Sequence, residues 1–228
     1  MTTHDKPLAV LWDMDGTLID SEPYWMSAET TLATQYGVTW THEDAVGVIG
    51  KPLPVSAQVL IDHGVNAPAD VIIDALLTSV AARIRQAVPW QDDARTLLDA
   101  VVAAGIPCAL VTMSYGSVLD AFLAAAPPVF DVIVPGDQME HGKPHPEGYL
   151  TAAQRLGVDI TRCVAIEDSP GGVSAAYDSG AQTIAVQRLA PVNSRPRMTR
   201  VQSLAHVTVD TLAAVAAGEH WDEGDASR

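Results

Sequence analysis

Hydrophobic and polar positions along the chain alternate between short apolar runs and longer stretches with the spacing of amphipathic helices. The apolar runs are rich in Val, Ile, Leu and Ala, which is typical of strands buried on both faces of a parallel sheet. They cover residues 8–12, 107–111, 132–134, 163–166 and 183–186. Helical patterns cover residues 94–104, 116–125, 146–156 and 172–179. This alternation predicts an α/β fold with a Rossmann-like, doubly wound parallel sheet.

One interval, residues 20–87, interrupts this alternation. It has no convincing strand pattern, only helical patterns at residues 22–36, 53–63 and 69–87, and it is far longer than an ordinary loop in an α/β protein. We therefore predict an α-helical cap domain at residues 20–87, inserted into a core of residues 1–19 and 88–218. The insertion would be a mobile lid or, alternatively, a static helical addition. The polar residues 219–228 predict a flexible tail.

The composition excludes several classes of partner. The 228 residues include 28 acidic and 13 basic side chains, and a net charge of −15 argues against binding nucleic acid or an anionic membrane surface. No apolar run reaches transmembrane length, and the first residues lack the pattern of a signal peptide. Cys108 and Cys163 each begin an apolar run and are typical of buried, reduced thiols in a cytoplasmic protein. We expect a monomer or a weak homodimer.

Polar residues follow four of the predicted strands. They are Asp13 and Asp15, the segment Thr112-Met113-Ser114, Lys143, and the pair Glu167-Asp168. Each group by itself is explained by a turn, a helix cap or a solvated lysine. Because the carboxyl ends of parallel strands meet at one edge of a sheet, however, we expect the four groups to converge.

Such a set of side chains suits phosphoryl transfer. Carboxylate oxygens are the ligands that Mg²⁺ prefers, and a lysine neutralises phosphate charge. Hydroxyl and backbone N–H groups at the start of a helix can hold phosphate oxygens. A free carboxylate can act as a nucleophile and form an acyl-phosphate.

These residues also resemble, in the same order, the four motifs of the haloacid dehalogenase superfamily. The resemblance rests on Asp13-x-Asp15-Gly16-Thr17, Thr112, Lys143-Pro144 and Glu167-Asp168, and it extends from residue 8 to about residue 186. The helical insertion after the first motif resembles the type-1 cap of the subgroup that contains β-phosphoglucomutase and phosphoglycolate phosphatase.

The resemblance implies a role for each motif residue. Asp13 would attack phosphorus and form an aspartyl-phosphate, while Asp15 would protonate the leaving alcohol and then activate water. Mg²⁺ would be held by the Asp13 carboxylate, the backbone carbonyl of Asp15 and Asp168, with Glu167 nearby or ligating.

The second and third motifs would bind the phosphoryl group. The resemblance implies that Thr112 and the backbone of Met113 contact its oxygens, and we add Ser114 to this substrate-binding set. Lys143 would offset the negative charge of the nucleophile and the phosphate.

Two residues of the first motif favour one activity of the superfamily over the others. Dehalogenases of the superfamily lack the second aspartate, so Asp15 disfavours dehalogenation. Phosphatases of the subgroup usually carry Thr at the position of Thr17, where β-phosphoglucomutases tend to carry Val. We therefore predict a Mg²⁺-dependent phosphatase that acts on a small phosphorylated metabolite, a sugar or polyol phosphate. A phosphosugar mutase of the β-phosphoglucomutase type is the alternative, and a catalytically silent binding domain is a third hypothesis.

Substrate choice is expected to depend on the cap. Its residues 20–87 include three basic and eight acidic side chains, so a second phosphate is not strongly favoured there. Lys51 lies in a Gly- and Pro-marked segment, residues 47–54, which resembles the specificity loop of type-1 caps. We predict a substrate contact for Lys51, with an exposed loop lysine as the equal alternative.

Two further groups have no role in this scheme. His141 and His145 flank Lys143 but lack the sequence spacing of a metal site, so we expect loop or capping roles for them. Four arginines, Arg188, Arg195, Arg197 and Arg200, are concentrated in residues 187–200. We expect a solvated loop there, or a contact with an acidic partner.

Overall fold

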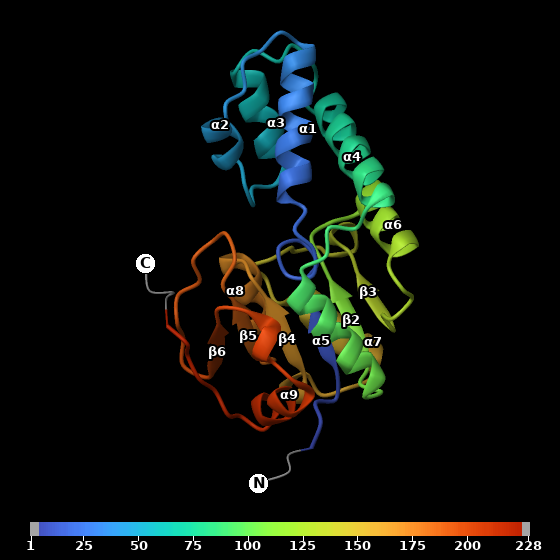
Figure 1. Ribbon diagram of the computed structural model, residues 1–228, viewed down its shortest axis with the longest axis vertical. Coiled ribbons are helices and arrows are strands. Elements are labelled where there is room, and N and C mark those ends of the chain that lie inside the picture. Colours follow the sequence, from blue (N-terminus) through green and yellow to red (C-terminus); the bar gives the residue numbers. More distant parts are fainter. Residues whose placement is uncertain (1–4, 225–228) are drawn as a thin grey trace. The chain divides into compact units, whose positions relative to one another are not determined.

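The protein contains a six-stranded, all-parallel sheet with the strand order β3-β2-β1-β4-β5-β6 (Figure 1). The computed structural model describes residues 5–224. The strands are β1 (Val10–Trp12), β2 (Cys108–Val111), β3 (Val132–Val134), β4 (Val164–Glu167), β5 (Gln182–Val186) and β6 (Met198–Val201). This strand order is that of a doubly wound sheet and confirms the predicted α/β fold.

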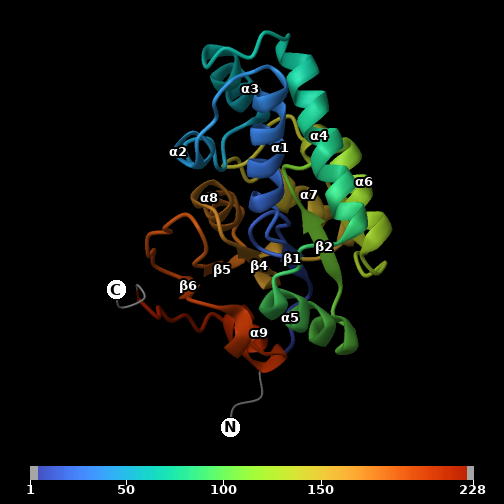
Figure 2. The same ribbon diagram turned by 45° about the horizontal axis from the view of Figure 1, so that its top comes forward.

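Helices cover both faces of the sheet. Figure 2 shows α5 (Asp92–Ala103) and α9 (Val209–Ala216) on one face, and α7 (Glu147–Leu156) and α8 (Pro170–Asp178) on the other. The core under α7 and α8 is built largely from alanines, including Ala109, Ala152, Ala165, Ala175 and Ala176. Small side chains allow α7 and α8 to pack close to the strands.

The chain forms two compact units. Of the described residues, one unit comprises 5–19, 90–115 and 128–224, and it contains the whole sheet. The other comprises residues 20–89 and 116–127 and is entirely helical. Its helices are α1 (Glu22–Gln35), α2 (His42–Val46), α3 (Leu53–Asp62), α4 (Ala69–Gln86) and α6 (Gly116–Ala125).

The helix α6 differs from its expected assignment. Its apolar pattern was read as part of the α/β core, but its buried side chains, which include Val118 and Phe122, belong to a helix that packs along α4. An amphipathic pattern identifies the buried face of a helix but not the surface that covers it, because any apolar surface satisfies that face.

Three elements lie outside the sequence-based expectations: α2, α9 and β6. The five-residue helix α2 is too short for a periodic pattern, although Thr41 and Asp44 form a capping box that marks its start. The strand β6 was expected to be loop because four arginines are concentrated in residues 187–200. It lies at one edge of the sheet, where β5 is its partner strand.

The arginine concentration is only partly solvated. The guanidinium of Arg188 donates to Asp93 at 2.7 Å, and both side chains are largely buried. Arg195 and Arg197 both lie over the ring of Tyr177, with guanidinium carbons 5.6 and 5.7 Å from its centre. These contacts tie the connection around β6 to the core. The expectation of a solvated loop is wrong for Arg188, whereas Arg197 is exposed.

Residues 219–224 make specific contacts although a flexible tail was expected there. The Arg200 side chain donates to Asp222 at 2.8 Å, and the backbone N–H of Arg200 donates to the carbonyl of Trp221 at 3.0 Å. The backbone N–H of Glu223 donates to the Arg200 carbonyl at 3.0 Å. This segment thus pairs with the outer edge of β6. Residues 225–228 of the expected tail lie outside the described residues.

Both cysteines, Cys108 and Cys163, are buried and unpaired, as expected. Within residues 5–224, none of the helices combines the length and the apolar character that a membrane span requires.

A buried glutamate in α1 generates a prediction about stability. Glu29 is only 5% exposed, and burial together with the charge of Glu22 raises its pKa to about 7. A carboxyl group whose pKa is raised in the folded state loses its proton more readily in the unfolded chain. It therefore destabilises the folded state increasingly as pH rises from the pKa of the unfolded chain towards 7. Glu29→Gln removes this penalty. The change that Glu29→Gln makes to the free energy of unfolding should therefore be about 2 kcal/mol more stabilising at pH 8 than at pH 5.

Urea unfolding followed by circular dichroism at both pH values measures this difference. Glu43→Gln is the control, because Glu43 is an exposed glutamate of the same helical unit. Equal pH dependence in Glu29→Gln and the wild type would show that Glu29 is not the group responsible.

Candidate active site

The predicted site residues lie at the point where the strand order reverses. β1 has β2 on one side and β4 on the other, so the carboxyl ends of β1 and β4 border the crevice in which doubly wound sheets bind ligands. Leu11 pairs with Ala109 and Ala165, and Trp12 pairs with Leu110 and Ile166. One residue further on, the same register aligns Asp13, Val111 and Glu167 in a row across three strands.

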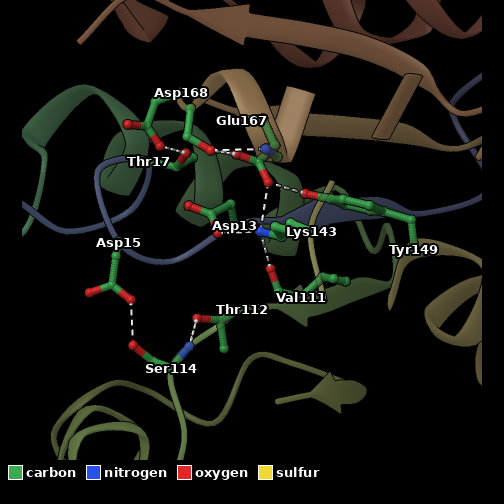
Figure 3. A network of polar contacts seen from close by, with 12 residues as sticks. Asp13, Asp15, Thr17, Val111, Thr112, Ser114, Lys143, Tyr149, Glu167 and Asp168 are labelled. Atoms are coloured by element: carbon green, nitrogen blue, oxygen red, sulfur yellow. Dashed lines mark hydrogen bonds and ion pairs between the residues drawn. The ribbon is translucent and has the colours of Figure 1, made fainter. Parts of the chain in front are cut away.

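This row forms the binding site of the Lys143 ammonium group. Nζ of Lys143 lies 2.5 Å from Oδ1 of Asp13 and 2.6 Å from Oε1 of Glu167, and it donates to the Val111 carbonyl at 2.9 Å (Figure 3). The lysine side chain is only 7% exposed. Burial alone would lower the pKa of Lys143, but the carboxylates of Asp13 and Glu167 raise it above its ordinary value. The ammonium therefore stays charged.

Glu167 is fully buried, and the helices on its side of the sheet determine its position. Side chains alternate along β4, so Glu167 faces α7 and α8 as Ala165 does. Oε1 of Glu167 also accepts a hydrogen bond of 2.6 Å from the hydroxyl of Tyr149, a buried residue of α7. On the α8 side there is room for the carboxylate only because residue 172 is glycine, since a Cβ there would overlap the carboxylate of Glu167.

Asp168 comes one residue later and contacts the loop after β1. The hydroxyl of Thr17 donates to Oδ1 of Asp168 at 2.9 Å (Figure 3). The backbone of Gly16 approaches this carboxylate so closely that a Cβ would overlap it, and its φ of +90° is a conformation that favours glycine. The sequence Gly16-Thr17 thus positions Asp168 against Asp13.

Within residues 5–224, protein groups balance the charge of this cluster only in part. Oxygen atoms of Asp13, Glu167 and Asp168 lie within 4.8 Å of one another, and one ammonium group, Lys143, pairs with them. Burial, and next the charge of Glu167, raise the pKa of Asp13 well above its ordinary value. The same two causes raise the pKa of Asp168 to about 7. Excess negative charge on closely spaced oxygen donors fits a hard divalent cation, the class to which Mg²⁺ belongs.

Asp15 lies apart from this group of carboxylates. Its Oδ2 accepts a 2.6 Å hydrogen bond from the hydroxyl of Ser114, and the backbone N–H of Ser114 donates to the Thr112 hydroxyl at 2.9 Å (Figure 3). The two aspartates of the first motif therefore have different partners: an ammonium for Asp13 and a hydroxyl for Asp15. Because an N–H already donates to the oxygen of Thr112, the hydroxyl hydrogen of that residue can be donated to another acceptor.

The remaining predicted substrate residues are less constrained. The Met113 side chain is 45% exposed, while its backbone follows the buried Thr112 at the end of β2. Lys51 is an exposed residue between α2 and α3 in the helical unit, and its role stays a prediction.

Two polar side chains of the site were not singled out from the sequence. Tyr149 reads as an ordinary core position of an amphipathic helix, because its hydrogen bond to Glu167 depends on packing between α7 and β4. Thr17 belongs to the first motif, but the sequence assigns it no contact in the site. Its position directly after Asp15-Gly16 is the local signal, since the turn after β1 carries it to Asp168.

The close packing at Glu167 generates a prediction about Gly172. Gly172→Ala places a methyl group in the space of the Glu167 carboxylate, which must then shift away from Lys143. We expect the free energy of unfolding to fall by about 1–3 kcal/mol. Gly171→Ala is the matched control, because a Cβ at the neighbouring residue meets only open space. Urea unfolding compares the two variants, and equal effects would exclude overlap with Glu167 as the cause.

Comparisons with known proteins show several similar phosphatases and one similar solved structure. The chain is 30% identical over 190 residues to the fructose-1-phosphate phosphatase YqaB of Escherichia coli. The aligned residues cover 82% of this chain and 100% of the relative. It is 32% identical over 198 residues to hexitol phosphatase A of the same organism, with 86% and 89% covered. A solved structure from Thermotoga maritima, described as a candidate β-phosphoglucomutase, has a TM-score of 0.73 at 25% identity, with 92% and 98% covered.

The chain also matches a protein family over most of its length. Residues 10–186 match the family described as haloacid dehalogenase-like hydrolase, a range that begins with β1 and ends with β5. It therefore includes the helical insertion and every residue of the Lys143 network. The chain belongs to the haloacid dehalogenase-like hydrolases.

Proposed function

We propose that this protein is a Mg²⁺-dependent phosphatase that hydrolyses a small sugar or polyol phosphate through an aspartyl-phosphate intermediate. The observation that carries the proposal is the buried cluster of Asp13, Lys143 and Asp168 at the strand-order reversal, beside the separate Asp15–Ser114 pair. The first group suits a nucleophile with charge compensation, and the second suits proton transfer.

In the first step, a carboxylate oxygen of Asp13 attacks the phosphorus of the bound ester. A bond between this oxygen and phosphorus forms while the bond from phosphorus to the substrate alcohol breaks. Asp15 donates its proton to the departing alcohol oxygen. The Lys143 ammonium lies 2.5 Å from Asp13 and offsets the charge that nucleophile and phosphate bring together.

In the second step, water attacks the phosphorus of the aspartyl-phosphate. Asp15, now ionised, accepts a proton from the water, and the bond between phosphorus and the Asp13 oxygen breaks. Inorganic phosphate leaves, and the carboxylate of Asp13 and the proton on Asp15 are restored.

Asp13 and Asp168, together with the backbone carbonyl of Asp15, would hold Mg²⁺. When bound, the ion reduces the repulsion between the Asp13 carboxylate and the phosphate dianion. Glu167 is less suited to direct ligation because its Oε1 is already bonded to Lys143 and Tyr149. We propose for Glu167 the role of holding Lys143 in place beside the ion.

The relatives support a sugar or polyol phosphate as substrate. Two of them are named as a fructose-1-phosphate phosphatase and a hexitol phosphatase, and a third, from Thermotoga maritima, as a phosphorylated carbohydrates phosphatase. We propose the helical unit, and Lys51 within it, as the source of substrate selection. The two unpaired, buried cysteines support a cytoplasmic location.

A phosphosugar mutase remains the second candidate. It is favoured by the structural similarity to the candidate β-phosphoglucomutase of Thermotoga maritima. A mutase would use Asp13 and Asp15 in the same way but return the phosphoryl group to a hydroxyl of the sugar instead of to water. The residues of the Lys143 network serve both reactions.

The phosphatase proposal is tested with a panel of sugar and polyol phosphates, with released inorganic phosphate as the readout. We expect turnover that requires Mg²⁺ and is abolished by EDTA. Asp13→Asn removes the nucleophile and should lower turnover at least about a thousandfold.

Asp137→Asn is the matched control, since Asp137 is an exposed aspartate of the same unit and should leave turnover unchanged. Full activity in Asp13→Asn, or no turnover of any ester in the panel, would refute the proposed mechanism.

The choice between hydrolysis and mutase activity is tested with β-glucose 1-phosphate. Hydrolysis yields glucose and inorganic phosphate, whereas a mutase yields glucose 6-phosphate. We expect inorganic phosphate as the only phosphorus product in a ³¹P NMR spectrum. Accumulation of glucose 6-phosphate, without free phosphate, would establish the mutase reaction instead.

A further inference from the structure

A second group of metal-ligating side chains lies on the segment that carries Lys143. It consists of His141, His145 and Glu147, and each offers a ligand atom within 4.8 Å of the other two. The chain turns between them, where the backbone N–H of His145 donates to the Gly142 carbonyl at 3.0 Å. The turn brings both imidazoles to Glu147, the first residue of α7.

One distance within this group matches that of a small coordination site, and a second is about half an ångström longer. Nδ1 of His141 lies 3.3 Å from Oε2 of Glu147, and Nδ1 of His145 lies 3.9 Å from the same oxygen. Ligands bound about 2.1 Å from a tetrahedral Zn²⁺ are separated by about 3.4 Å. The two rings lie side by side with their centres 4.7 Å apart. A small rotation of the exposed His145 ring would complete the geometry.

Glu147 is held in place for this role by the backbone. The N–H groups of Glu140 and His141 donate to its two carboxylate oxygens, each at 2.8 Å. These bonds lower the pKa of Glu147, so its side chain is ionised at neutral pH. Such contacts orient a carboxylate in the way that outer hydrogen bonds orient metal ligands in proteins.

The imidazole of His145 is also in the form that binds metals. The backbone N–H of Glu147 donates to Nδ1 of His145 at 3.3 Å. Because an N–H can donate only to an unprotonated ring nitrogen, a lone pair is present on Nδ1. That lone pair accepts the Glu147 N–H in this structure, so a cation would replace this 3.3 Å hydrogen bond as its partner.

We propose that His141, His145 and Glu147 form a second metal site, specific for a divalent cation of the Zn²⁺ class and separate from the carboxylate cluster. Two nitrogen donors and one carboxylate suit Zn²⁺ rather than Mg²⁺, which prefers oxygen donors throughout. The histidines are more than half exposed, whereas the Lys143 side chain of the same segment is buried. The two sites therefore occupy opposite sides of one short segment.

A cation bound there would link residues 141 and 145 to the start of α7. The linked segment is the one that presents Lys143 to Asp13 and Glu167. Metal binding would therefore restrain the segment that carries the charge-compensating lysine without contacting the Mg²⁺ ligands. The sequence alone did not indicate this site because its carboxylate, Glu147, approaches the histidines only through the turn.

The test uses the full-length protein, with Mg²⁺ in excess to occupy the carboxylate cluster and Zn²⁺ alone as the probe. Equilibrium dialysis with metal analysis should find one bound Zn²⁺ per chain. His141→Asn and His145→Asn should each weaken this binding at least about tenfold, because each removes one of three ligands. His206→Asn, a change of an exposed histidine in the same unit, should leave it unchanged.

A second measurement separates this site from the carboxylate cluster. Asp168→Asn disables the cluster and should leave the bound Zn²⁺ in place, whatever its effect on phosphatase activity. In ¹⁵N NMR spectra, the imidazole signals of His141 and His145 should shift together on Zn²⁺ addition, and those of His206 should not. Loss of Zn²⁺ in Asp168→Asn, or its retention in both histidine variants, would overturn the proposal.

Discussion

The ammonium group of Lys143 lies between Asp13 and Glu167, almost completely shielded from solvent. Buried charges are tolerated only when they are paired, and removal of one partner of such a pair typically costs about 3–5 kcal/mol. The strand ends of β1 and β4 must therefore stay in register, because the register aligns the two carboxylates that the lysine needs. With Asp168, three carboxylates lie around the single ammonium group of Lys143, and this excess of negative charge fits a bound cation.

Much of the surrounding structure accommodates this charged group. Glycine at positions 16 and 172 is required because the carboxylates of Asp168 and Glu167 occupy the space of a side chain. The alanine-rich core lets α7 lie close enough for Tyr149 to reach Glu167. Stability and chemistry are thus coupled at this edge of the sheet, since the contacts that hold the buried charges are also the ones that orient the proposed nucleophile.

Sequence patterns predicted the strands of the sheet better than the side-chain contacts of the segments between them. Five of the six strands were expected within two residues of their ends, because buried parallel strands are continuous apolar runs. Arg188 was misjudged because local sequence does not show that Asp93, about a hundred residues away, accepts a hydrogen bond from it. His141 and His145 were likewise given no shared role, since Glu147 meets them only after the chain turns at residues 142–145.

The sequence by itself determined the α/β class, the helical insertion and the identity of the residues at the strand ends. These features follow from local periodicity and from the rule that parallel strands bring their carboxyl ends to one edge. Only the tertiary structure decided which of those residues touch: Lys143 with Asp13 and Glu167, Thr17 with Asp168, and Ser114 with Asp15. The physical reason is that hydrogen bonds and ion pairs act over about 3 Å, a distance that depends on packing between distant segments.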